Sequence, residues 1–194
     1  IVTKFVCNPP SISEMNSEYI HEWLEDIQKE WMENIQNEEA HELILEIAKE
    51  KGGATTFLGG MFDNTSKHKV LNVYAIGDTN IFILRKSKSK ISEEDIFPIK
   101  TVEQFTDHTQ AIFSIKSSNS ELVLKKEKFV VEKGDSIILA TDAMAKWILK
   151  SSNLGQKPWN KILKNKNSIE KFIDELRATN KLDDDDTTCV ILQI

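Results

Sequence analysis

Three apolar, strand-like segments of this chain each meet aspartate at one end. Asp78 and Asp142 follow two of them, and an aspartate run at 183–186 comes just before the third, at 187–192. An unpartnered carboxylate near a protein core is costly, whereas one at the rim of a sheet is well placed to hold a cation. Three converging rims of this kind would form the oxygen-only site that Mg²⁺ and Mn²⁺ prefer.

Each aspartate also has a purely structural interpretation. Asp is a favoured helix N-cap, which suits Asp142, and a common turn residue, which suits Asp78. The run at 183–186 suits a solvated loop. Their joint occurrence at strand ends favours the cation site, because carboxylates brought together repel one another and a cation relieves that repulsion.

The hydrophobic periodicity changes twice along the chain. Apolar residues recur at helical spacing first, at strand-like spacing in the middle, and at helical spacing again before a last strand. The expected helices cover 20–35, 38–51, 144–149, 159–163 and 168–177. The expected strands cover 54–62, 70–76, 81–84, 121–124, 129–131, 137–141 and 187–194. This order predicts a layered α+β fold.

Glycines mark two special points in the strand region. Gly59-Gly60 predicts a bend or bulge within its strand, and 77–80 predicts a tight hairpin turn between neighbouring strands. No linker or repeat interrupts the 194 residues. We therefore expect one domain.

Composition excludes several classes of function. A net charge of −6 argues against a nucleic-acid partner. No apolar run approaches the roughly 18 residues of a membrane span, and no signal-peptide pattern is present, so we expect no membrane partner and a cytoplasmic location. The two cysteines have no C-x-x-C spacing: Cys189 is expected to be a buried, inert thiol, and a disulfide with Cys7 is the alternative.

Four short motifs resemble those of the metal-dependent protein serine/threonine phosphatases, the protein phosphatase 2C (PPM) family. They occur in the family's order, and the similarity runs from Gly52 to Ile194. The motifs are Gly53-Ala-Thr-Thr56, Asn72-Val-Tyr-Ala-Ile-Gly-Asp-Thr79, Ile138-Leu-Ala-Thr-Asp-Ala143 and Asp185-Asp-Thr-Thr188. The segment 140–147, with Pro158-Trp159 and Leu176-Arg177 downstream, is most similar to the family's bacterial branch.

The resemblance implies a four-layer α-β-β-α sandwich, with a central antiparallel β-sandwich flanked by helices. It implies two or three Mg²⁺ or Mn²⁺ ions. Asp142 and Asp185 would be core metal ligands, Asp186 would replace Asp185 if the register shifts by one, and Asp78 would bind a third ion. The implied reaction is hydrolysis of phosphoserine or phosphothreonine on a phosphorylated protein, in signalling, by metal-bound hydroxide.

The sequence also departs from the family pattern. The family's N-terminal acidic strand and Asp-Gly motif are not visible, no arginine precedes Arg85, and Ala143 stands in place of a glycine. We therefore expect residues 1–194 to form a single phosphatase-like domain that lacks its N-terminal strands and is inactive alone. A catalytically inactive scaffold or sensor module is the alternative, and a purely structural cation site is a third hypothesis. The oligomeric state stays open.

Overall fold

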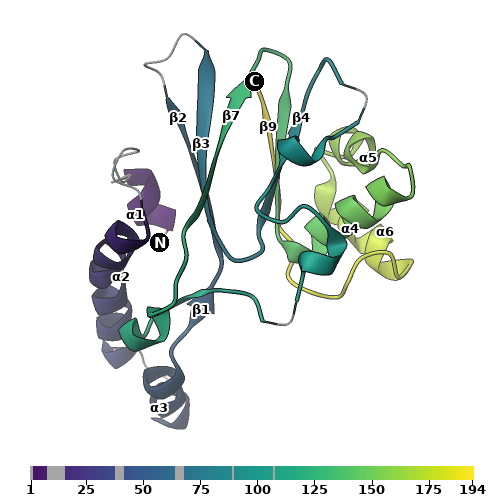
Figure 1. Ribbon diagram of the computed structural model, residues 1–194. Helices are drawn as coiled ribbons and strands as arrows, with labels where there is room; N and C mark the ends of the chain where they lie inside the picture. The colour runs from purple at the N-terminus through teal and green to yellow at the C-terminus, as the bar shows by residue number, and fades with distance from the viewer. Residues whose placement is uncertain (1, 8–15, 38–41, 64–67, 89, 107) are drawn as a thin grey trace.

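The computed structural model describes residues 2–7, 16–37, 42–63, 68–88, 90–106 and 108–194. Two antiparallel sheets pack face to face, and each carries helices on its outer face (Figure 1). The expected α+β, four-layer arrangement is therefore confirmed.

One side of the sandwich consists of a helix layer and a three-stranded sheet. Its helices are α1 (Val2–Cys7), α2 (Ser17–Asn37) and α3 (Glu42–Lys51). The sheet has the order β2-β3-β7, from β2 (Phe57–Asp63), β3 (Lys69–Ile76) and β7 (Lys125–Val131). A separate ribbon pairs β1 (Ala54–Thr55) with β6 (Ile112–Phe113).

The other side of the sandwich consists of the second sheet and its own helix layer. The sheet order is β5-β4-β8-β9, from β4 (Asn80–Leu84), β5 (Ile96–Phe97), β8 (Ser136–Ala140) and β9 (Cys189–Gln193). The covering helices are α4 (Asp142–Asn153), α5 (Pro158–Lys164) and α6 (Ile169–Ala178). Three short 3₁₀ helices lie in the connections: η1 (Glu93–Asp95), η2 (Val102–Gln104) and η3 (Lys116–Asn119).

The residues of β4 are almost all apolar because this strand is covered on both of its faces. Ile81 and Ile83 point into the core between the two sheets, whereas Phe82 and Leu84 point toward helices α4 to α6. A strand covered on both faces needs apolar side chains at every position. The other outer core joins α2 to β2 and β3, through residues such as Trp23 and Tyr74.

Two predictions about the strand region were wrong, one for a hairpin turn and one for a bulge. The turn at 77–79 is not a hairpin, because β3 pairs with β2 and β7 whereas β4 pairs with β5 and β8, so this turn carries the chain from one sheet to the other. Gly59 and Gly60 form no bulge, since both pair in regular register with β3. A Cβ atom on Gly59 would lie 2.7 Å from the Phe5 ring, so glycine there lets α1 approach the sheet.

Two further elements differ from expectation. The segment 121–124 is not a strand, and pairing begins at Lys125 instead. Helix α3, which corresponds to the helix predicted at 38–51, begins at Glu42 in the described part of the chain. Residues 38–41 of that prediction lie outside the described residues. Its apolar side chains Leu43, Ile44 and Ile47 remain exposed.

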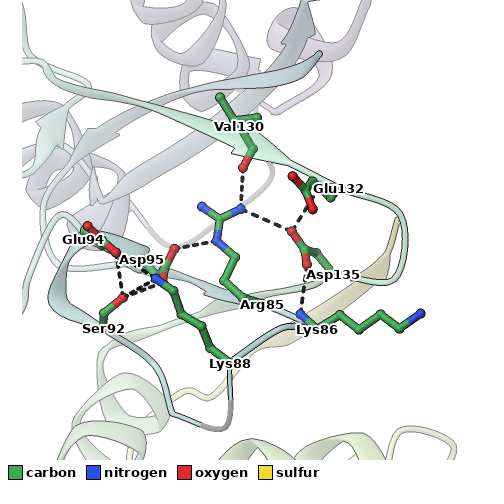
Figure 2. A network of polar contacts seen from close by, with 9 residues as sticks. All are labelled: Arg85, Lys86, Lys88, Ser92, Glu94, Asp95, Val130, Glu132 and Asp135. Atoms are coloured by element: carbon green, nitrogen blue, oxygen red, sulfur yellow. Dashed lines mark hydrogen bonds and ion pairs between the residues drawn. The ribbon is translucent and has the colours of Figure 1, made fainter.

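A polar network around Arg85, with two buried aspartates, ties the two sheets together (Figure 2). Arg85 donates to Asp95 Oδ1 at 2.6 Å, to Asp135 Oδ2 at 3.2 Å and to the carbonyl of Val130 in β7. Asp135 Oδ1 accepts the backbone N–H of Lys86 at 3.0 Å. One guanidinium thus links the end of β4 to η1, to β7 and to the β7–β8 turn.

Both cysteines are free, so the disulfide alternative was wrong. Burial raises the pKa of the Cys189 thiol to about 11, which keeps it protonated and unreactive. No helix in the described ranges is both long and apolar enough to cross a membrane.

Candidate acidic site at the strand ends

The register of the second sheet brings three loops to one end of the sandwich. Asn80 lies opposite Ala140, and Ala140 lies opposite Cys189. Asp78 comes just before β4, Asp142 just after β8, and the 183–186 run just before β9. All three loops therefore leave the sheet at the same end.

The four predicted aspartates line one pocket of about 450 Å³ at this end. Threonines and alanines complete the wall. The lining residues are Ala54, Thr55, Thr56, Asp78, Thr79, Thr109, Ala111, Thr141, Asp142, Asp185 and Asp186. The structure thus brings the four together, and their role as metal ligands stays a prediction.

Threonine hydroxyls hold the walls of the pocket against one another. Thr56, just before β2, and Thr79, just before β4, share a hydrogen bond of 2.8 Å. Thr141 Oγ1 accepts the backbone N–H of Thr188 at 2.9 Å, and the backbone N–H of Thr141 donates to the carbonyl of Thr188 at 3.1 Å. These bonds fix the end of β8 to the segment that leads into β9.

Asp78 and the aspartate run are each held by a local donor. Thr109 Oγ1 donates to Asp78 Oδ2 at 2.9 Å. The backbone N–H of Asp186 donates to Asp185 Oδ1 at 2.7 Å, and Arg177 from α6 binds the carbonyl of Asp185. The Asp185 carbonyl and one of its carboxylate oxygens thus have protein donors.

Asp142 is not the N-cap of α4, because Thr141 holds that position. Asp142 lies in the first turn, where the helix dipole stabilises a negative charge. Its carboxylate is paired: Lys146 Nζ lies 3.1 Å from Asp142 Oδ2 and 4.0 Å from Asp183 Oδ2. Burial lowers the pKa of Lys146, but its hydrogen bond to Asp142 and the charges of Asp142, Asp183 and Asp78 outweigh this and raise it.

Sequence reasoning missed Lys146, Thr109 and Arg177. A signal existed for Lys146, since a lysine four residues after an aspartate shares its helix face. Nothing local in the sequence pointed to Thr109 or Arg177, because each reaches the site from a distant element.

The oxygens of the pocket's carboxylate and hydroxyl groups are ligands of the type that Mg²⁺ and Mn²⁺ bind in proteins. Their present arrangement does not hold an ion: among the described residues, no three carboxylate, imidazole or thiol side chains are grouped closely enough. The donor types therefore fit a metal ion, and a bound ion would need the aspartate side chains to draw closer together than they lie here.

No protein-family model and no curated protein matches the sequence. Among solved structures, the chain is similar to the phosphatase domain of the cell-fate determinant SpoIIE from Bacillus subtilis, in a manganese-presoaked structure and in a second structure. Each comparison has 16% identity and covers 86% of this chain and 73% of that domain, with TM-scores of 0.43 and 0.44. Values this low assign neither a family nor an activity.

Proposed function

We propose that this chain is part of a domain that hydrolyses phosphoserine or phosphothreonine on proteins with Mg²⁺ or Mn²⁺. The observation that carries the proposal is the gathering of Asp78, Asp142, Asp185 and Asp186 in one pocket at the strand ends. Four aspartates from three separate segments of the chain line this pocket, and a binding role for a cation explains why they are kept on one side of the molecule.

The chain's own residues would do the positioning in this reaction. Asp142 sits on a rigid junction between β8 and α4, and the hydrogen bonds around Thr141 fix that junction to the loop that carries Asp185 and Asp186. A bound divalent ion would supply the acidity that activates a water for attack on phosphorus. A phosphorylated protein is the proposed substrate, with no nucleic-acid partner.

The full-length gene product tests this function. It is expected to hydrolyse p-nitrophenyl phosphate with Mn²⁺, and Asp142→Asn is expected to abolish the activity. Asp174→Asn is a matched control, because Asp174 is an exposed residue of α6 outside the pocket. Hydrolysis that survives both Asp142→Asn and EDTA would refute the proposal.

A second candidate function is a catalytically inactive scaffold or sensor with the same architecture. The pairing of Lys146 with Asp142 favours it, because an ammonium already neutralises part of the acidic pocket. Binding of a phosphoprotein by the full-length gene product without turnover, unchanged by EDTA, would identify this second function.

A further inference from the structure

Lys146 is held beside the acidic pocket by three separate groups. Its ammonium lies 3.1 Å from Asp142 Oδ2 and 4.0 Å from Asp183 Oδ2, and it lies 5.5 Å from the centre of the Phe105 ring. An ammonium over an aromatic face is attracted by the ring quadrupole. Only 27% of the Lys146 side chain is exposed, so this cation is fixed at the carboxylates rather than moving freely in solvent.

The carboxylate that Lys146 contacts is the one best placed to be a metal ligand. Asp142 is the one pocket aspartate that belongs to a helix, since it begins α4 and is separated from the end of β8 by one residue. One of its two oxygens already faces an ammonium. A divalent ion that bound this oxygen at about 2.1 Å would lie close to the Lys146 charge, and the two cations would repel each other.

We propose that Lys146 is a built-in competitor for the cation at Asp142, so that a divalent ion binds in full only when Lys146 moves away. The inference rests on the proposed function, because it assumes that the pocket takes a cation. It accounts for two observations together: among the described residues no three such side chains form a metal-ready group, and an ammonium from the next helical turn already contacts one oxygen of Asp142.

Manganese binding to the 194-residue chain, measured by calorimetry, tests this competition. Lys146→Met keeps the apolar stem and removes the charge, and is expected to raise Mn²⁺ affinity about tenfold or more. Lys146→Arg keeps the charge and is expected to leave affinity as low as in the wild type. Lys150→Met removes a lysine from the exposed side of the next turn, as a control for net charge, and is expected to change little.

Thermal unfolding gives an independent readout. Without metal, Lys146→Met leaves Asp142 without its ammonium partner, and the melting temperature is expected to fall by about 2 to 4 °C. Saturating Mn²⁺ is expected to restore it, because the metal takes over the neutralising role. The Lys150→Met control is expected to melt at the wild-type temperature in both conditions.

Failure of the proposed competition and failure of the proposed function give different results in these experiments. Equal Mn²⁺ affinity in wild type and Lys146→Met, with binding lost in Asp142→Asn, would overturn the competition and leave the proposed function standing. A loss of orthovanadate binding in Lys146→Met, at unchanged Mn²⁺ affinity, would overturn it in favour of a phosphate-binding lysine. No Mn²⁺ binding by any variant of this chain would overturn the competition, and the p-nitrophenyl phosphate assay on the full-length gene product would then decide the metal-dependent function separately.

Discussion

At the scale of single residues, Arg85 shows how the sandwich is held together by charge. Its guanidinium contacts Asp95 and Asp135, whose side chains are only 1% and 5% exposed. Two buried carboxylates are tolerable because they share this partner and accept further hydrogen bonds from Ser92 and from backbone N–H groups. Removal of the guanidinium would leave Asp135 without its cationic partner and Asp95 with Lys88 alone, whose Nζ lies 3.1 Å from Asp95 Oδ2.

Arg85→Met is therefore expected to destabilise the protein by about 3 kcal/mol, the loss typical when one partner of a buried ion pair is removed. Urea unfolding measures the change. Lys86→Met is the matched control, since the Lys86 side chain is exposed and only its backbone contacts Asp135. An equal loss in both variants would show that the network contributes no more than a surface lysine.

The same network predicts how stability depends on pH. Burial raises the pKa values of Asp95 and Asp135, but hydrogen bonds and the Arg85 charge outweigh it and hold both pKa values below the ordinary 3.8. Carboxylates with lowered pKa values stabilise the fold above about pH 5, and that contribution is lost as the pH falls through the lowered values.

Urea midpoints measured from pH 7 to pH 3 are expected to drop toward the acid end in the wild type. They are expected to drop less steeply in Arg85→Met, because the carboxylate pKa values return toward normal without the guanidinium. Parallel curves for the two proteins would argue that other carboxylates dominate the acid response.

At the scale of secondary-structure elements, the turn at 77–79 decides how the two sheets are joined. Gly77 has φ +101°, and a Cβ atom on it would lie 2.5 Å from Thr56 Cγ2 and 2.8 Å from the carbonyl oxygen of Gln110. The turn therefore needs glycine for both its backbone angle and its close packing. Through Thr56 and Thr79 it also holds one wall of the acidic pocket.

Gly77→Ala is expected to cost about 3 kcal/mol, from backbone strain together with overpacking. Gly155→Ala separates the two effects: Gly155 also has positive φ, at +73°, but nothing lies within 4 Å of its would-be Cβ, so about 1 kcal/mol is expected. Denaturant midpoints of the two variants compare these costs. Equal destabilisation would mean that packing against Thr56 contributes nothing.

Sequence periodicity predicted most elements, because helices and strands bury their apolar residues at regular spacing. It failed at 77–79, since a turn between paired strands and a turn between packed sheets use the same residue types. It failed at Gly59 because the reason for that glycine is Phe5, which is distant in sequence. The gathering of the four aspartates in one pocket was predictable from the strand ends, but the contact of Thr109 with Asp78 from a long loop was not.

At the scale of the whole molecule, the sandwich is open along one side. Val190 lies opposite Leu139, and Leu192 lies opposite Ile137, so both β9 side chains are on the inner face of their sheet. They are nevertheless 42% and 41% exposed. A space of about 690 Å³ separates β9 from β2 and is lined by Leu139, Val190 and Leu58.

This opening lies between two sheet edges, because among the described strands β2 and β9 each have a neighbour on one side only. Edge strands with exposed apolar side chains are templates for pairing with another chain. The 194-residue chain is therefore expected to self-associate through this opening.

Sedimentation velocity over a range of concentrations measures this association. Val190→Lys places a charge on the open inner face of β9 and is expected to shift the chain toward monomer, since a buried lysine would oppose pairing. Val123→Lys is the matched control: Val123 is 50% exposed in a loop outside the sheets, so the same change there is expected to leave association intact. A wild-type chain that stays monomeric at all concentrations, or an equal effect of both lysines, would show that the opening is not an association surface.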